Sequence, residues 1–142
     1  MMLLAGDIGG TKTNLAVFST EAGPRAPLAE ATFPSREYPS LEAVAREFLS
    51  QVDLQVEQAT FGVSGPVVRG QATITNLPWV MRETQIEEEL HLAPVRLLND
   101  LEAIANGVPF LEPTDLRTLN ESQAAPEGAL AVIAPGTGLG EA

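Results

Sequence analysis

Short blocks of hydrophobic residues near the start of the chain alternate with polar positions, which is typical of strands. Three blocks, at residues 2–8, 13–19 and 28–33, predict three consecutive strands. A Gly-rich stretch separates the first two, and residues 21–27, with one glycine and two prolines, separate the second from the third. Consecutive strands joined by short turns pair antiparallel, so this part of the chain predicts a β-meander.

Helical spacing replaces the alternation after residue 39. Ser40 can cap a helix at this point. The apolar face that follows consists of Leu41, Val44, Ala45, Phe48, Leu49 and Val52. This face is expected to cover the sheet. The alternating segment 58–64 then predicts a strand that runs parallel to an earlier one, which makes the helix part of a βαβ crossover.

A second crossover is predicted further along the chain. Residues 67–74 predict a hairpin that turns at Arg69-Gly70, and residues 84–87 fit a capping box that starts a short helix. The apolar run 94–99 predicts a strand buried on both faces, followed by a helix that ends near Pro109. The predicted fold class is α/β, a mixed sheet in which an N-terminal antiparallel β-meander is followed by βαβ crossovers.

The last part of the chain repeats the opening pattern. Residues 111–128 predict a loop with one edge strand at 116–119. Residues 129–134 predict an apolar strand that leads into a second Gly-Thr turn at 135–140, and no partner strand is expected after it.

A strand without a partner is an unusual end for a domain, so we expect the chain to be a piece of a longer protein. Residues 1–112 would form a small α/β domain. Residues 113–142 would be a linker with the first strand and turn of a truncated large domain. The alternative is a short protein with a frayed end.

Composition and charge narrow the range of partners. A chain of 142 residues with 44% hydrophobic residues can bury a core, and its net charge of −11 argues against nucleic acid or an anionic membrane as a partner. The absence of cysteine excludes disulfides and thiolate chemistry and suits a reducing compartment. No stretch has the length of a membrane span or a signal peptide. We therefore expect a cytoplasmic protein.

The first Gly-rich turn carries the clearest candidate chemistry. Gly9 and Gly10 lack a Cβ, so their backbone can form an anion-binding nest, and Asp7, Thr11 and Lys12 crowd the same turn. The spacing fits neither a P-loop nor a dinucleotide fingerprint, and a strand rather than a helix follows. The turn is expected to hold phosphate. The alternative is a hairpin whose glycines serve geometry alone.

Several motifs together carry a family resemblance. The segment GDIGGTKT, residues 6–13, resembles the first phosphate motif of the actin-like sugar kinases, and PGTGLG, residues 135–140, resembles the second. The whole order, including Tyr38-Pro39-Ser40-Leu41, residues 75–79 and Leu98-Asn99-Asp100, is similar to the bacterial ATP-dependent glucokinases. The resemblance implies an actin-like ATPase (ribonuclease H-like) fold, ATP and Mg²⁺ as cofactors, glucose as substrate and a homodimer as one assembly.

The resemblance also implies roles for residues at the sugar site. Asp100 would take the proton of the sugar 6-hydroxyl, and Asn99 would hydrogen-bond sugar hydroxyls. Ser64, Gly65 and Asn76 would border the sugar. Asp100 begins a helix at the edge where open α/β sheets bind ligands. The alternative interpretations are a helix cap for Asp100 and plain turn residues for the other three.

The resemblance likewise implies contacts to phosphate and to a metal ion. Asp7 would hold Mg²⁺ through water, because Mg²⁺ gives up its hydration shell reluctantly; the alternative is a turn aspartate that bonds local amides. Lys12 would meet either phosphate or solvent. The expected phosphate contacts are Gly9, Gly10, Thr11, Lys12, Gly136, Thr137 and Gly138.

Two other functions and an inert fragment remain as alternatives. A related ROK-type kinase would act on fructose, mannose or N-acetylglucosamine, and a sugar-sensing regulator would use the same fold without catalysis. The remaining sugar and adenosine contacts are expected beyond residue 142, so the chain alone is expected to have little kinase activity. Trp79 is expected to pack in the core, His91 to end a helix in solvent, and the glutamates at 87–89 to be solvated.

Overall fold

The computed structural model describes residues 1–121, 128–135 and 139–141. Contacts within the chain divide it into two units, Met1–Asp100 and Leu101–Ala142. The domain boundary expected after residue 112 stays a prediction.

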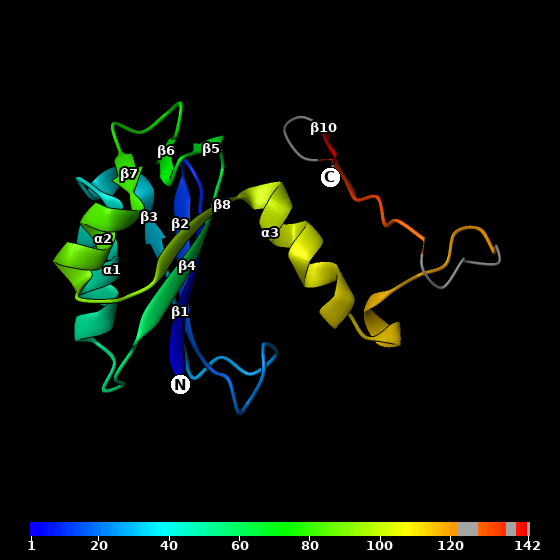
Figure 1. The fold of residues 1–142 in the computed structure, drawn as a ribbon, viewed down its shortest axis with the longest axis horizontal. Coiled ribbons are helices and arrows are strands. Elements are labelled where there is room, and N and C mark those ends of the chain that lie inside the picture. Colours follow the sequence, from blue (N-terminus) through cyan, green and yellow to red (C-terminus); the bar gives the residue numbers. More distant parts are fainter. Residues whose placement is uncertain (122–127, 136–138, 142) are drawn as a thin grey trace. The chain divides into compact units, whose positions relative to one another are not determined.

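The first unit is built on a five-stranded mixed sheet, ordered β3-β2-β1-β4-β8 (Figure 1). Its strands are β1 (Met2–Ile8), β2 (Lys12–Ser19), β3 (Ala29–Pro34), β4 (Gln58–Val63) and β8 (Val95–Asn99). The first three pair antiparallel, whereas β4 is parallel to both β1 and β8. The structure confirms the predicted meander and the two crossovers.

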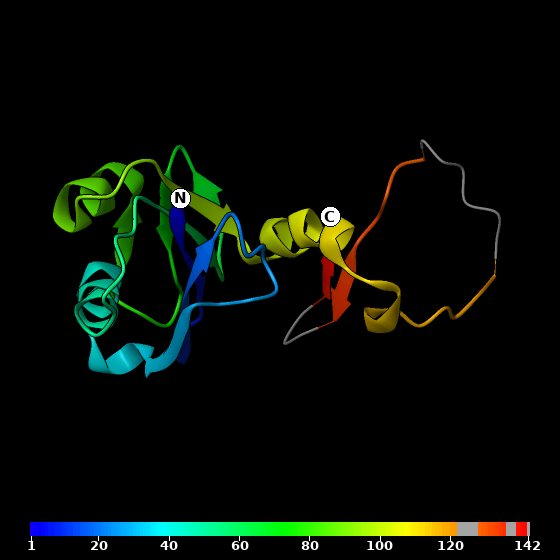
Figure 2. The same ribbon diagram turned by 90° about the horizontal axis from the view of Figure 1, so that it is seen from below.

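Two helices, α1 (Leu41–Ser50) and α2 (Glu83–Leu90), cover one face of this sheet (Figure 2). The side chain of Ser40 accepts a hydrogen bond from the Ala43 amide, as expected of the N-cap. The buried side chains alternate along the strands and line the helix faces. The largest of them are Trp79, Phe48, Phe61, Leu4, Ile8, Leu41, Met81 and Ile86.

A small second sheet follows β4, with strands β5 (Val67–Val68), β6 (Gln71–Thr73) and β7 (Val80–Arg82). Arg69 and Gly70 both have positive φ, at 51° and 70°, so the predicted hairpin turns with type I′ geometry. Trp79 is buried and its indole N–H donates to the carbonyl of Tyr38. Desolvation raises the pKa of the Tyr38 phenol above its usual 10.0, and the nearby carboxylate of Glu47 raises it further by a smaller amount.

The predicted start of α2 was wrong. The helix begins at Glu83, and its N-cap, Arg82, makes no side-chain capping bond. Glu87 does not reach back to close a capping box, because its carboxylate accepts a hydrogen bond from the Val95 amide at 2.9 Å. Glu87 is therefore half-buried, whereas Glu88 and Glu89 are exposed as expected. His91 is exposed and ends the helix in the left-handed conformation.

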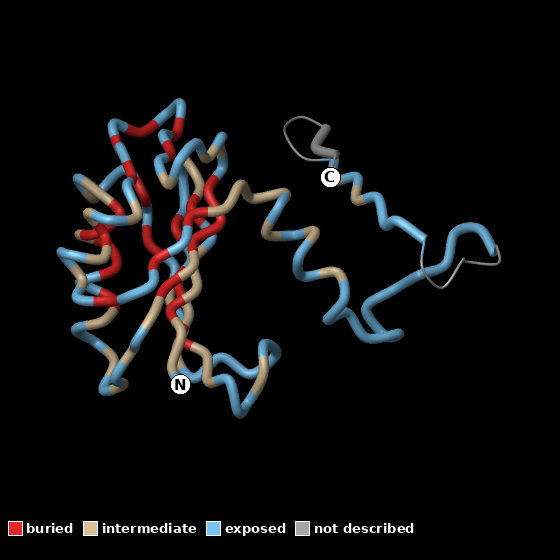
Figure 3. Tube along the Cα trace, viewed as in Figure 1, coloured by how far each residue is buried: buried red, intermediate tan, exposed pale blue. Residues whose placement is uncertain are grey.

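The second unit contains most of α3 (Asp100–Gly107), the short helices η2 (Val108–Phe110) and η3 (Pro113–Asp115), and a hairpin of β9 (Ile133–Pro135) and β10 (Leu139–Glu141). None of its residues whose exposure the structure describes is buried (Figure 3). No helix in the described ranges is long and apolar enough to cross a bilayer.

Three expectations for the second unit were wrong. The predicted edge strand at 116–119 is absent from the described residues, because Leu116 and Leu119 are exposed and no neighbouring strand pairs with them. The predicted strand at 129–134 is confined to β9. A partner strand does follow: β10 pairs antiparallel with β9.

We predict that Phe61→Ala destabilises the first unit strongly. Phe61 is 0% exposed in the middle of the sheet, so its truncation should lower the free energy of unfolding by about 3–5 kcal/mol. Urea denaturation monitored by the fluorescence of Trp79, the single tryptophan, measures this loss. Leu119→Ala is the control: this side chain is 93% exposed, and its removal should change the free energy by less than about 0.5 kcal/mol. Equal effects of the two changes would contradict the packing described here.

Candidate functional site

The candidate site lies at one edge of the five-stranded sheet, where three parallel strands end together. In the pairing register Ile8 lies beside Val63, and Val63 lies beside Asn99. Gly9, Ser64 and Asp100 therefore follow at the same edge. Neighbouring strands lie about 4.8 Å apart, so the ends of β1 and β8 are separated by about 10 Å. Open α/β sheets bind their ligands at this edge.

The Gly-rich turn joins β1 to β2 at this edge. The amide of Gly9 donates to the carbonyl of Lys12 at 2.9 Å, so it is used within the turn. A Cβ on Gly9 would lie 3.0 Å from that same carbonyl oxygen, which explains the glycine by a close approach. Within the part of the chain that the structure describes, the amides of Gly10 and Thr11 have no hydrogen-bond partner. These two amides can receive an anion.

Ser35, the first residue of the short helix η1 (Ser35–Glu37), supports the turn from inside the protein. Its hydroxyl donates to the carbonyl of Gly9 at 2.8 Å, and its amide donates to the carbonyl of Thr11 at 3.0 Å. The hydroxyl of Thr13 lies 2.9 Å from the Ser35 hydroxyl, and both side chains are buried.

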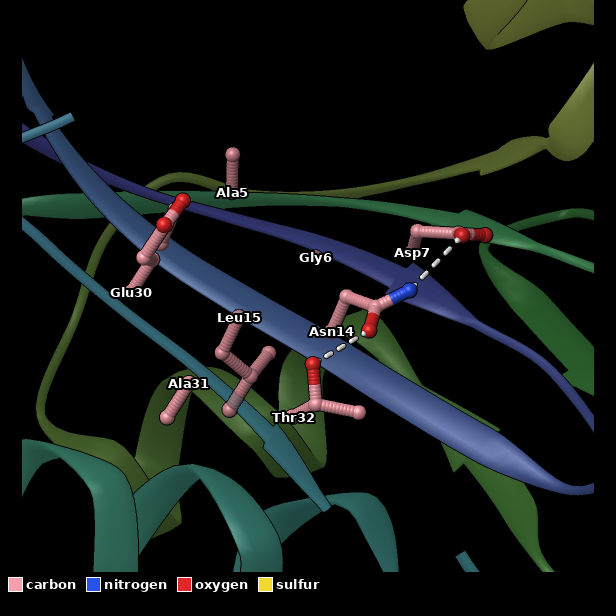
Figure 4. A pocket seen from close by; sticks show the side chains of 9 residues that line it. Ala5, Gly6, Asp7, Asn14, Leu15, Glu30, Ala31 and Thr32 are labelled. Atoms are coloured by element: carbon pink, nitrogen blue, oxygen red, sulfur yellow. Dashed lines mark hydrogen bonds between the residues drawn. The ribbon is translucent and has the colours of Figure 1, made fainter. Parts of the chain in front are cut away.

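Asp7 is the penultimate residue of β1, and its side chain is exposed. The amide of Asn14 donates to a carboxylate oxygen of Asp7 at 3.2 Å, and the hydroxyl of Thr32 donates to Asn14 at 2.8 Å (Figure 4). Asp7 and Asn14 line a hollow of about 610 Å³ on the sheet. The described residues contain no cluster of three or more His, Cys, Asp or Glu side chains that could hold a metal ion.

The Ser64-Gly65 turn is tied to the end of β8. The amide of Ser64 donates to the carbonyl of Ile8, and the side-chain amide of Asn99 donates to the carbonyl of Gly65 at 3.0 Å. A Cβ on Gly65 would lie 2.7 Å from the carbonyl oxygen of Thr73, so this position requires glycine. Three of the residues predicted on the sugar side, Ser64, Gly65 and Asn99, thus lie together.

Asn76 lies next to the Gly-rich turn. A Cβ built on Gly10 would lie 3.7 Å from the Cβ of Asn76 and 3.6 Å from the side chain of Ile74. Both distances are ordinary van der Waals contacts. The turn therefore lies near the segment that was expected to border the sugar, with room for a methyl group between them.

The remaining predicted site residues divide into two groups. Asp100 is half-buried and begins α3, and Lys12 is exposed at the start of β2. The second Gly-Thr turn, with Gly136, Thr137 and Gly138, lies outside the described residues.

Sequence reasoning missed the residues that support the turn: Thr13, Asn14, Thr32 and Ser35. A signal was present for Thr13, which alternates with the buried Leu15 and Val17 along β2. A polar side chain at an inward position must have a buried hydrogen-bond partner. The identity of that partner, Ser35, could not be deduced from local sequence.

Known proteins resemble this chain over nearly its whole length. The glucokinase family model matches residues 4–142. The glucokinase of Nostoc punctiforme is 34% identical over 142 residues, and that of Psychromonas ingrahamii is 37% identical over 139 residues. These matches cover 99% and 98% of this chain but only 42% and 43% of the relatives, so the chain spans less than half of their length.

Solved structures agree with the sequence matches. The crystal structure of a glucokinase from an Antarctic psychrotroph is 30% identical, with a TM-score of 0.87 over 99% of this chain and 45% of that one. A ROK family glucokinase from Streptomyces griseus, solved with glucose and AMPPNP, is 25% identical with a TM-score of 0.63, over 99% of this chain and 43% of that one. The mixed sheet with its turn and strand ends is thus the actin-like fold of the sugar kinases, and the chain belongs to the glucokinase family.

Proposed function

We propose that this chain is the amino-terminal part of an ATP-dependent glucokinase, which transfers the terminal phosphoryl group of ATP to the 6-hydroxyl of glucose. The observation that carries the proposal is the shared edge at which the Gly-rich turn, Ser64-Gly65 and Asn99-Asp100 meet. Relatives named glucokinase and the Streptomyces griseus complex with glucose and AMPPNP support it. Residues 1–112 would form the small domain, and residues 113–142 would begin the large one.

The Gly-rich turn would hold the phosphates of ATP. The amides of Gly10 and Thr11 and the hydroxyl of Thr11 would donate to phosphate oxygens, and Gly9 would shape the turn. Lys12 is exposed nearby and would add positive charge. The second turn, with Gly136, Thr137 and Gly138, would hold the phosphates from the large domain.

Asp7 fits a magnesium ion that is held mainly by substrate and water. Mg²⁺ in kinases keeps several waters and takes one or two carboxylates together with phosphate oxygens, so a lone carboxylate beside the turn suffices. The ion would neutralise charge on the transferred phosphoryl group. Asn14 and Thr32 would hold the Asp7 carboxylate in a fixed orientation by their hydrogen bonds.

Asp100 would accept the proton of the attacking sugar hydroxyl. Asp100 follows β8 and so lies at the same edge of the sheet as the Gly-rich turn. An in-line transfer requires the proton acceptor and the phosphate site to be close together in this way. Asn99 would hydrogen-bond the sugar, in an orientation set by its bond to Gly65. Ser64, Gly65 and Asn76 would line the sugar on the side of the turn.

The proposal implies a cytoplasmic protein, since glucose phosphorylation draws on the ATP of the cytoplasm. A homodimer is the assembly that the family resemblance suggests. Analytical ultracentrifugation of the full-length protein would test the dimer.

The central test is Asp100→Asn in the full-length protein. Loss of the proton acceptor should lower kcat by about 10²- to 10⁴-fold, while the KM for glucose changes less. Glucose 6-phosphate formation, coupled to its dehydrogenase, measures both. Asp53→Asn changes an exposed loop carboxylate and should leave the kinetics unchanged. Full activity of Asp100→Asn would refute this role.

The wild-type assay also tests the substrate. Absence of glucose phosphorylation by the full-length protein would refute the proposed function. Fructose, mannose and N-acetylglucosamine in the same assay distinguish a glucokinase from a kinase of another hexose.

A second prediction concerns the nucleotide. Thr11→Val keeps the shape of the exposed side chain but removes its hydroxyl, so the KM for ATP should rise by about five- to tenfold, as for one lost hydrogen bond. The KM for glucose should stay the same in a steady-state assay that varies each substrate. Thr20→Val, at an exposed threonine beyond the end of β2, is the matched control. An unchanged KM for ATP in Thr11→Val would exclude this hydroxyl as a phosphate ligand.

A further inference from the structure

Ser35 contacts the Gly-rich turn at two carbonyls. Its hydroxyl bonds the carbonyl of Gly9, and its amide bonds the carbonyl of Thr11, so a single residue holds the backbone on both sides of Gly10. Ser35 follows β3 directly and is 0% exposed. The turn is therefore fastened to the interior of the domain rather than only to its own two strands.

The hydroxyl pair of Ser35 and Thr13 has a defined direction. A serine hydroxyl has one proton, and that of Ser35 is donated to the Gly9 carbonyl. In the 2.9 Å contact between the two hydroxyls, Thr13 must therefore be the donor. The result is a directed chain from Thr13 to Ser35 to Gly9. Both hydroxyls are buried. Loss of one partner would therefore leave the other without a hydrogen bond from water, which costs free energy.

These two hydrogen bonds, from Thr13 to Ser35 and from Ser35 to Gly9, control where the Gly10 amide points. The Gly9 carbonyl and the Gly10 N–H belong to the same peptide unit, and in a trans peptide they point in opposite directions. Because Ser35 holds the carbonyl toward the interior, the N–H is turned away from the interior. The Gly10 amide is also one of the two turn amides that have no partner within the described residues.

We propose that Ser35 and Thr13 are positioning residues for nucleotide binding: their buried hydroxyls fix the Gly-rich turn so that the Gly10 amide faces the phosphates of ATP. The inference rests on the proposed function and deepens it. Neither side chain contacts the nucleotide, and both act through the backbone of the turn.

The test compares KM values for ATP and glucose in the full-length protein. Thr13→Val keeps the side-chain shape and removes the donor, whereas Thr13→Ser keeps the donor. The KM for ATP should rise about five- to tenfold in Thr13→Val and in Ser35→Ala, with the KM for glucose within about twofold of wild type. Thr13→Ser should have a KM for ATP close to that of wild type.

Ser40→Ala is the control for a general loss of stability. It removes the N-cap of α1, which typically costs about as much stability as a buried hydrogen bond, but Ser40 bonds the Ala43 amide and not the turn. Thermal unfolding of each variant shows the size of that loss. The KM for ATP should stay unchanged in Ser40→Ala.

Two results would overturn the inference in an active wild-type enzyme. One is a wild-type KM for ATP in Thr13→Val. The other is a rise of the KM for ATP and the KM for glucose together in Thr13→Val and Ser35→Ala, with the same rise in Ser40→Ala at an equal loss of stability. That result would mean that the two hydroxyls serve only the stability of the fold. An inactive wild-type enzyme would instead refute the proposed function, and this inference would fall with it.

Discussion

The parallel register of β1, β4 and β8 is the constraint on which the candidate site depends. Hydrogen bonding of these strands brings Ile8, Val63 and Asn99 into one row, so the residues that follow them leave the sheet at the same edge. Segments separated by about ninety positions in the sequence therefore meet at one edge of the sheet. A slip of one residue in either pairing would turn Asp100 to the other face of the sheet.

The sheet ends at β8 because α2 covers the outer amides of that strand. Glu83 and Glu87 lie four residues apart on α2, and their carboxylates accept hydrogen bonds from the amides of Leu97 and Val95 at 2.8 and 2.9 Å. An edge strand with open amides invites pairing with another chain. Here two carboxylates satisfy these amides, and they hold in place the strand that ends at Asn99, directly before Asp100.

Sequence patterns predicted those strands and helix ends that are determined by residues nearby in the sequence. Alternation located the strands of the meander, and Ser40 marked the start of α1, because both signals act within a few residues. The start of α2 was missed because the carboxylate of Glu87 bonds Val95, in a strand that comes later. The support of the Gly-rich turn was missed because Ser35 is 26 positions from Gly9. Bonds between distant segments have no signature in local spacing.

The glycines of the site show the same division between local and distant causes. Neither Gly9 nor Gly10 has a positive φ, although Gly70 in the small hairpin does. A Cβ on Gly9 would crowd the carbonyl of Lys12, three residues away, at 3.0 Å. Gly65 is required by the carbonyl of Thr73, in another strand. Gly10 has only ordinary contacts around its missing Cβ. The fold therefore does not demand a glycine at this position. A glycine is what the proposed approach of phosphate to the backbone of the turn would require.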